Sequence, residues 1–305
     1  MKLLVIGSNS FSGSHFVSEA LRNNHSVIGV SRSKEPKSLF LAYKWSNNQN
    51  SLKLLEKNFT FQSLDLNKDL DLLIKLVDEY EPEYVVNFAS QGMVAESWLE
   101  PTHWYQTNLL SQVAFHDFLR KKKFLKKYVH ISTPEVYGDT NGWIKENHNF
   151  NPTTPYSVSR AACDNHLLSF FKAYDFPVIF TRAANVYGPG QQLYRIIPRT
   201  ILSIRTGKKL YLHGSGHSKR SFVHISDVVK ATLKLTLEAE PGTCWHISTK
   251  EALSIRNLVQ KICNIGNLNF DEIVKDVEER LGKDKNYFLD SSKIRKIYNW
   301  EDSIN

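Results

Sequence analysis

Short apolar runs alternate with longer segments of helical periodicity over the first 184 residues of the chain. The apolar runs are nearly continuous and do not alternate with polar residues, which is typical of parallel strands covered on both faces. This alternation predicts an α/β fold with a Rossmann-like, doubly wound parallel sheet. The expected strands are residues 3–7, 26–31, 60–66, 83–90, 127–133 and 177–184, and the expected helices are residues 12–24, 70–80, 104–123 and 157–174.

The pattern becomes irregular after residue 184, where the expected helices and strands are shorter. We therefore expect a dinucleotide-binding Rossmann domain over residues 1–184 and a smaller, mainly substrate-binding lobe over residues 185–305. No apolar run approaches the ~20 residues that span a membrane, so no membrane insertion is expected. The three cysteines are widely spaced and form no CxxC motif, which favours a cytoplasmic protein without a metal site.

The chain carries a net charge of +8, which allows a nucleic-acid, membrane or small-anion partner. The densest basic run, "RKKKFLKK" at residues 120–127, lies where an expected helix ends before a strand. Cations at a helix C-terminus complement its dipole, and the sequence contains no known nucleic-acid-binding motif. We therefore interpret the run as a solvated helix end and expect no nucleic-acid partner.

The stretch "GSNSFSG", residues 7–13, follows the first expected strand and opens the first expected helix. In this context backbone N–H groups and a helix N-terminus bind a pyrophosphate. Gly7 would form the tight turn, Gly13 would permit close packing, and Ser10 stands where the middle glycine is usual. The candidate cofactor contacts in this turn are Gly7, Ser10, Phe11 and Gly13.

The end of the second expected strand reads Ser31, Arg32 and Ser33, without the acidic residue that commonly binds the ribose hydroxyls of NAD. Arg and Ser can bind a 2′-phosphate, so we expect NADP(H) more than NAD(H). Alternatively, Arg32 stacks on the adenine and says nothing about phosphate. Asp65, after the third strand, is placed to bond the adenine edge. The remaining candidate cofactor contacts are Leu66 and Ala89.

Polar side chains gather at the end of the fifth expected strand, in "HISTPEVYGD" at residues 130–139. Thr133 and Glu135 lie where open α/β sheets bind their ligands. Tyr156 and Arg160 begin the helix that follows, four residues apart and therefore on one helix face. A hydroxyl, a carboxylate, a phenol and a cation in this order predict a catalytic site.

These motifs resemble those of the extended short-chain dehydrogenases/reductases that act on nucleotide sugars, the NAD(P)-dependent epimerase/dehydratase family. The resemblance covers nearly the whole chain, and it is strongest for 4,6-dehydratases. The matching motifs are "STPEVYG", "YSVSR", "NVYGP", "RSFVHISD" and "YFLDSSKIRKIYNW".

The resemblance implies that Tyr156 is the base that takes a sugar hydroxyl proton. A free phenol titrates near pH ~10, so it needs a neighbouring cation to act near neutrality. Arg160, in place of the usual Lys, would supply that charge and bond the nicotinamide ribose. Thr133 would bond the C4 oxygen and Glu135 would remove the C5 proton. Pro134 stands where the family has an acid.

The implied reaction is 4,6-dehydration of a nucleoside-diphosphate sugar. An epimerase or decarboxylase on the same scaffold, and a non-catalytic dinucleotide-binding sensor, remain the alternatives. Asn185 and Arg220 match positions that contact the substrate's phosphates, and Arg195 matches a basic position near the nucleotide or is a solvated helix residue. The resemblance also implies a homodimer through a four-helix bundle of the two long helices. The apolar residues expected to form it are Leu109, Phe115, Leu119, Leu167, Phe170 and Phe171.

Overall fold

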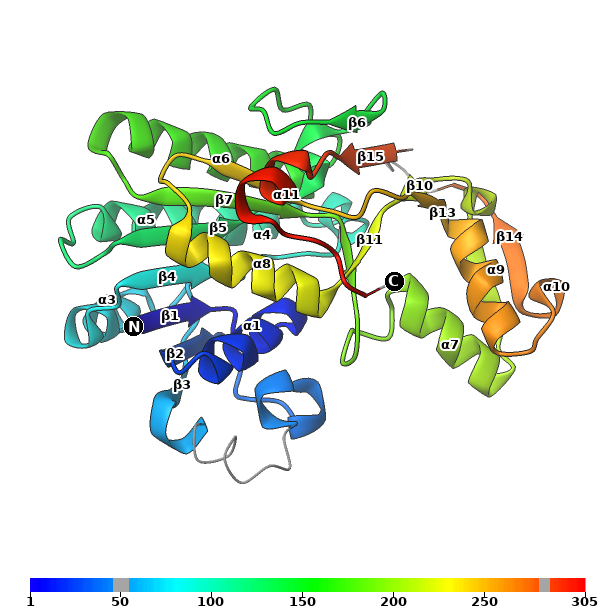
Figure 1. Cartoon of the computed structure of the whole chain (residues 1–305), viewed down its shortest axis with the longest axis horizontal. Helices are drawn as coiled ribbons and strands as arrows, with labels where there is room; N and C mark the ends of the chain where they lie inside the picture. Colours follow the sequence, from blue (N-terminus) through cyan, green and yellow to red (C-terminus); the bar gives the residue numbers. More distant parts are fainter. Residues whose placement is uncertain (46–54, 280–285, 305) are drawn as a thin grey trace.

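A seven-stranded parallel sheet forms the centre of the computed structural model, which describes residues 1–45, 55–279 and 286–304 (Figure 1). The strand order is β12-β7-β5-β4-β1-β2-β3, and every neighbouring pair is parallel. The Rossmann-like, doubly wound sheet expected from the apolar runs is confirmed. The strands are β1 (Lys2–Ile6), β2 (Ser26–Ser31), β3 (Phe59–Ser63), β4 (Tyr84–Asn87), β5 (Lys127–Ile131), β7 (Val178–Ala183) and β12 (Cys244–Ile247).

Helices cover both faces of this sheet, and each face has its own apolar core (Figure 1). One core joins the strands to α1 (Phe11–Arg22) and α8 (Ile225–Glu238). The other joins them to α3 (Leu70–Tyr80), α5 (Ser111–Leu119) and α6 (Pro155–Tyr174). Burial on both faces explains why the strand sequences are apolar at nearly every position.

The helix expected over residues 104–123 is interrupted. It consists of α4 (Pro101–Tyr105), a π-helical turn η4 (Gln106–Leu110) and α5. Asn108 in this turn is fully buried and bonds both the backbone of Gln91 and the hydroxyl of Ser159. π-Helical turns inside α-helices occur frequently at functional sites. Apolar periodicity does not reveal such a turn, because it inserts a single extra residue.

The chain after residue 184 builds a smaller lobe beside the sheet (Figure 1). Its core consists of apolar residues such as Leu212, Val259 and Phe270. A four-stranded sheet with the order β13-β10-β15-β6 and the pair β8–β11 connect the lobe to the main sheet. The elements are β8 (Asn185–Tyr187), α7 (Ile196–Thr206), β9 (Leu210–His213), β10 (Lys219–Arg220), β11 (Phe222–His224), β13 (Leu253–Ser254), α9 (Ile255–Ile265), α10 (Phe270–Ile273), β14 (Val274–Val277) and β15 (Asn286–Leu289), with β6 (Trp143–Ile144) from the first part of the chain. Helix α11 (Ser292–Tyr298) packs against the core of the main sheet.

The chain also returns from the second part to the main sheet, through α8 and the edge strand β12. The division at residue 184 therefore remains a prediction, because the segments on either side of it share one core. The short 3₁₀ helices are η1 (Ser38–Phe40), η2 (Ala42–Lys44), η3 (Glu96–Trp98), η5 (Pro134–Tyr137) and η6 (Gly214–Gly216).

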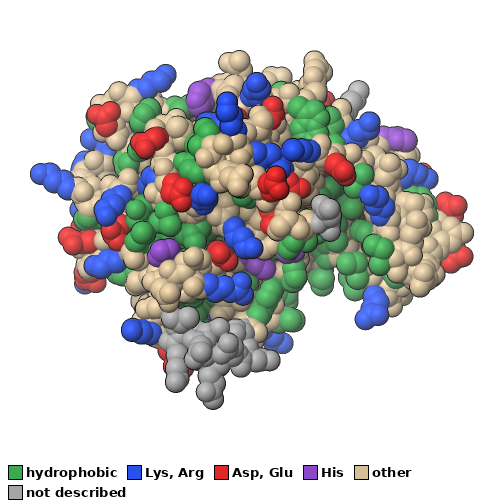
Figure 2. Space-filling model, in the orientation of Figure 1, with side chains coloured by type: hydrophobic (Ala, Val, Ile, Leu, Met, Phe, Trp, Pro, Cys, Tyr) green, Lys and Arg blue, Asp and Glu red, His purple; other side chains and the backbone are tan. Residues whose placement is uncertain are grey.

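Basic and acidic side chains are interspersed over the face of the molecule in Figure 2, without one large patch of either sign. The run at residues 120–127 includes cations paired with Asp117, Asp78 and Glu83. Across the described ranges, none of the helices has both the length and the hydropathy needed to cross a membrane.

Two adjacent leucines of α3 test this packing. Leu73 is 1% exposed in the core, whereas Leu72 is 57% exposed. Leu73→Ala should lower the free energy of unfolding by ~3 kcal/mol, because it leaves a cavity beneath the sheet. Leu72→Ala should lower it by less than ~0.5 kcal/mol. Urea denaturation followed by circular dichroism measures both, and equal losses would contradict the packing described for α3.

Candidate active site

The turn between β1 and α1 leaves no room for side chains at its two glycines. Gly7 has a φ of +83°, and a Cβ there would lie 2.7 Å from the backbone nitrogen of Ala89. A Cβ on Gly13 would overlap the carbonyl oxygen of Gly7. Ser10 caps α1 by accepting a 3.0 Å bond from the Gly13 N–H, and Phe11 begins the helix. A tight turn closed by a helix N-terminus fits a dinucleotide pyrophosphate.

The ends of β2, β3 and β4 surround this turn, because β1 pairs with both β2 and β4. The sheet order reverses at this point, which is where open α/β sheets bind ligands. Asp65 forms a turn after β3, with its carboxylate accepting a 2.9 Å bond from the Asn67 N–H. Leu66 is buried in the core, and the Ala89 N–H donates to Asn87.

The three polar residues at the end of β2 already have partners. The hydroxyl of Ser31 accepts a 2.9 Å bond from the Asn9 N–H. The carbonyl of Ser33 accepts a bond from the Asn9 side chain, and Arg32 donates to the side chain of Gln91 at 3.4 Å. The two contacts of Asn9 fix the β1–α1 turn against β2.

Thr133, Pro134 and Glu135 lie directly after β5, where the chain forms η5. The Thr133 hydroxyl accepts a 3.3 Å bond from the Glu135 N–H. Tyr156 lies in the first turn of α6, which begins with Pro155 and a capping box formed by Thr154. Such a box fixes the entry of the helix and with it the direction of its first side chains.

Tyr156 and Thr133 are joined by a side-chain hydrogen bond. Burial, and to a smaller extent the charge of Glu135, raise the pKa of Tyr156 to about 12. The charges of Arg160 and Arg195 and the bond with Thr133 lower this pKa, but they do not outweigh burial. The site thus joins the phenol, the hydroxyl and the carboxylate expected from the sequence. Without cofactor, the phenol holds its proton firmly near neutrality.

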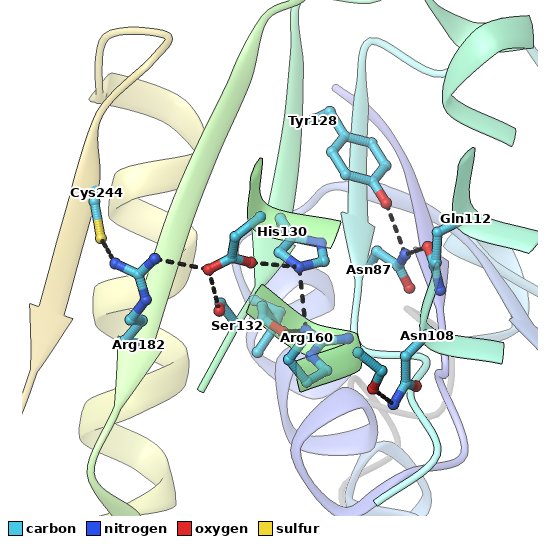
Figure 3. A network of polar contacts seen from close by, with 12 residues as sticks. Asn87, Asn108, Gln112, Tyr128, His130, Ser132, Arg160, Arg182 and Cys244 are labelled. Atoms are coloured by element: carbon cyan, nitrogen blue, oxygen red, sulfur yellow. Dashed lines mark hydrogen bonds and ion pairs between the residues drawn. The ribbon is translucent and has the colours of Figure 1, made fainter. Parts of the chain in front are cut away.

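The guanidinium of Arg160 points into the protein (Figure 3). Its Nη2 donates to the carbonyl of Ile131 and lies 3.2 Å from Nε2 of His130. The side chain is only 2% exposed. The guanidinium of Arg160 therefore bonds the end of β5. It acts on the pKa of Tyr156 through its charge.

The predicted substrate residues meet around Tyr287 of β15. The Tyr287 hydroxyl donates a 3.1 Å bond to the side chain of Asn185, and the Arg220 guanidinium lies 4.0 Å from the centre of its ring. The charges of Glu135 and Arg195 both act on the pKa of Tyr287, which burial raises. Asn185 and Arg220 therefore both contact Tyr287, whereas Arg195 is exposed and acts on it only through its charge.

Sequence reasoning missed two residues of this site. Tyr287 begins the late motif quoted above, so its place in the motif was a usable signal. No sequence signal marked Asn108, because it lies within an apolar run with helical periodicity. It donates a 3.0 Å bond to the Ser159 hydroxyl and thereby fixes the segment around Gln91 against α6.

A family model described as GDP-mannose 4,6 dehydratase matches residues 4–305 of the chain. The chain belongs to this family. The resemblance to NAD(P)-dependent nucleotide-sugar dehydratases and epimerases of the extended short-chain dehydrogenase/reductase type is thereby confirmed.

Similar proteins cover the whole chain. The dTDP-glucose 4,6-dehydratase of Escherichia coli is 27% identical over 98% of this chain and 89% of its own length. A trifunctional UDP-glucose 4,6-dehydratase/UDP-4-keto-6-deoxy-D-glucose 3,5-epimerase/UDP-4-keto-L-rhamnose-reductase of Arabidopsis thaliana is 28% identical over 99% of this chain. The chain spans less than half, 46%, of that plant relative. A dTDP-glucose 4,6-dehydratase from Streptomyces venezuelae, solved with NAD and TYD bound, superposes with a TM-score of 0.88 at 26% identity, covering 100% of this chain and 93% of that one.

The expected preference for NADP(H) is wrong. The Streptomyces venezuelae structure and that of a Bacillus anthracis dTDP-glucose 4,6-dehydratase, 26% identical to this chain, both contain NAD. The contacts at the end of β2 give a physical reason. The Ser31 hydroxyl is bonded to Asn9 and helps to form the turn, and Arg32 is bonded to Gln91 after β4, so both side chains already have partners within the protein.

Gly13→Ala tests the turn as a dinucleotide site. The added methyl would displace the Gly7 carbonyl, so NAD affinity should fall at least ~10-fold, or ~1.4 kcal/mol. Gly266→Ala is the matched control, because Gly266 ends α9 with a φ of −80° and a Cβ there meets its nearest atom at 3.3 Å. Calorimetric titration with NAD measures both affinities. Unchanged binding by Gly13→Ala would exclude this turn as the site.

Proposed function

We propose that the protein uses NAD to catalyse the 4,6-dehydration of a nucleoside-diphosphate sugar. The observation that carries the proposal is the position of Thr133 and Glu135, joined by a 3.3 Å hydrogen bond at the start of η5, with the charge of Glu135 acting on the phenol of Tyr156 in the first turn of α6. Dehydration needs a second base besides the one that serves oxidation, and Glu135 is a carboxylate in the right place for it. The name of the matched family and those of the relatives support the same reaction.

Bound NAD would supply the oxidation, taking a hydride from C4 of the sugar and returning it to C6 after water has left. Tyr156 takes the proton of the C4 hydroxyl while Thr133 bonds the C4 oxygen. The C4 ketone then acidifies C5, whose proton passes to Glu135. Pro134 has no side-chain proton to give, so we assign to Glu135 the delivery of that proton to the departing C6 hydroxyl. When the hydride returns to C6, C5 regains a proton, and the proton that Tyr156 took from the C4 hydroxyl balances it.

We assign the nucleoside diphosphate to Arg220, Arg195 and Asn185. A guanidinium bonds phosphate oxygens well, and Arg220 is held over the ring of Tyr287 within reach of Asn185. Gly7, Ser10, Phe11, Gly13, Asp65, Leu66 and Ala89 remain the proposed cofactor contacts, with Tyr156 and Arg160 on the nicotinamide side.

An epimerase is the second candidate, and Pro134 is the observation that favours it. A UDP-glucuronic acid 4-epimerase from Bacillus cereus superposes with a TM-score of 0.86 at 25% identity, covering 100% of this chain and 95% of that one. Epimerisation at C4 would use Tyr156 without any acid at position 134, but it would leave Glu135 without a task. A non-catalytic sensor is a weaker candidate, because the chain keeps the full set of hydroxyl, carboxylate, phenol and cation. A decarboxylase stays an alternative, because Glu135 fits that reaction as well.

Glu135→Gln separates dehydration from epimerisation. In a dehydratase the variant should still oxidise C4 but lose water elimination by ~100-fold or more, because an amide cannot take the C5 proton. NADH absorbance would then persist while the product mass shows no loss of water. The experiment uses a panel of nucleotide sugars with the parent as control. An epimerase would convert its substrate at nearly the parent rate.

The Tyr156–Arg160 pair predicts a pH dependence. Arg160→Met removes a charge that lowers the pKa of Tyr156, so this pKa should rise and oxidation should begin at a higher pH. Tyr156→Phe should abolish hydride transfer at every pH. Arg160→Lys should lower the rate ~10-fold if the site is built around Arg, a loss of ~1.4 kcal/mol. NADH formation against pH measures all three, and parent-like turnover by all of them would refute the mechanism.

We also propose a homodimer through α4, α5 and α6. Phe115, Leu119 and Leu167 lie in this chain's own core, so they leave no surface for a partner. Leu109, Phe170 and Phe171 are partly buried against the same core. The proposal therefore rests on exposed apolar residues of this face, Leu110 of the π-helical turn η4 at 56% and Val158 of α6 at 39% exposure. Light scattering at micromolar concentration tests it.

A further inference from the structure

Helix α6 carries opposite charges one turn apart. Arg160 and Asp164 have the four-residue spacing at which a cation and a carboxylate on one helix commonly pair. Within the described residues, these two side chains form no direct ion pair. The imidazole of His130, from β5, lies between them, with its Nε2 3.2 Å from Arg160 Nη2 and 3.1 Å from Asp164 Oδ1 (Figure 3).

Hydrogen bonding alone does not explain this arrangement. A single ring nitrogen of a neutral histidine can accept from Arg160 or donate to Asp164, but it cannot do both. Burial and the charge of Arg160 lower the pKa of His130 to about 4, so the ring is neutral at physiological pH. Two aromatic neighbours hold the ring of His130 in place. Its centroid lies 6.5 Å from that of Tyr128, on which it stacks, and 6.1 Å from that of Phe180, which it meets edge-on.

The space that His130 fills separates strong charges. Asp164 is fully buried, pairs with Arg182 at 2.7 Å and accepts a bond from the Ser132 hydroxyl. A buried carboxylate attracts a second cation strongly, because the surroundings screen charges poorly. Without the ring, the guanidinium of Arg160 could extend to Asp164 and leave the carbonyl of Ile131. Its charge would then lie farther along α6 from Tyr156.

We propose that His130 is a positioning residue, whose buried ring keeps the guanidinium of Arg160 off Asp164 and at the end of β5, where its charge acts on Tyr156. This inference rests on the proposed function, in which Tyr156 is the proton acceptor. The other charges that act on Tyr156 are Glu135 after β5 and Arg195 at the start of α7.

Two substitutions separate the bulk of the ring from its hydrogen bonds. His130→Ala opens the space, so Arg160 should turn to Asp164 and the pH at which C4 oxidation begins should rise by ~1 unit. The kcat at pH 7 should fall ~10-fold, with the KM for the sugar within ~2-fold of the parent, because the sugar contacts lie elsewhere. His130→Leu keeps similar bulk without a lone pair, and its kcat should stay within ~3-fold of the parent.

His116→Ala is the matched control. His116 is equally buried, on α5, and bonds the Tyr128 hydroxyl at 2.8 Å without contacting Arg160. It should lose stability as His130→Ala does, yet keep the parent pH profile. Circular dichroism and thermal denaturation confirm that each variant is folded. A pH shift of the same size in His116→Ala, or one as large in His130→Leu as in His130→Ala, would overturn the proposal.

A crystal structure of His130→Ala gives a readout that does not depend on turnover. Arg160 paired directly with Asp164 supports the positioning role, and Arg160 still at the Ile131 carbonyl overturns it. If His130→Ala does not fold, the crystal structure and pH profile of His130→Leu decide, since Arg160 should stay at Ile131 there. If the parent converts no nucleotide sugar, the proposed function fails while this structural test still stands.

Discussion

The buried carboxylate of Asp164 connects the helix that carries Tyr156 to the strands that carry the rest of the site. It pairs with Arg182 of β7, and Arg182 in turn donates to the Tyr137 hydroxyl and the Cys244 sulfur. Burial alone would raise the pKa of Asp164, but the charge of Arg182 holds it below its usual range. Removing either partner of such a pair leaves an uncompensated buried charge, which is strongly destabilising.

This connection determines where the proposed catalytic residues meet. Tyr137 belongs to η5, the segment that also carries Thr133 as its cap and Glu135. Arg182 therefore fixes η5 against β7 while Asp164 fixes α6 against β5. The phenol of Tyr156 and the carboxylate of Glu135 approach each other because both of their elements are tied to one buried ion pair.

Arg160 stands where the family usually has a Lys, so the positive charge near Tyr156 is kept while the shape of the side chain differs. A guanidinium is planar and has several donors, so it needs acceptors on more than one side. The structure supplies the Ile131 carbonyl and the His130 ring, and it leaves Nε of Arg160 without a partner. Burial and the charge of Glu135 keep the pKa of Tyr156 high. The positive charge of a bound cofactor would lower this pKa, as the charge of Arg160 does.

The sequence by itself determined the parallel sheet and the glycine turn, and it supplied the residues of the proposed catalytic group, because these follow from local periodicity and from motifs of adjacent residues. It did not predict the π-helical Asn108, the return of β12 to the sheet or the place of Tyr287 beside Asn185. It also misjudged Ser31 and Arg32, whose partners Asn9 and Gln91 are distant in the chain. Only the tertiary structure decided these points, because each depends on contacts between segments that the order of residues does not bring together.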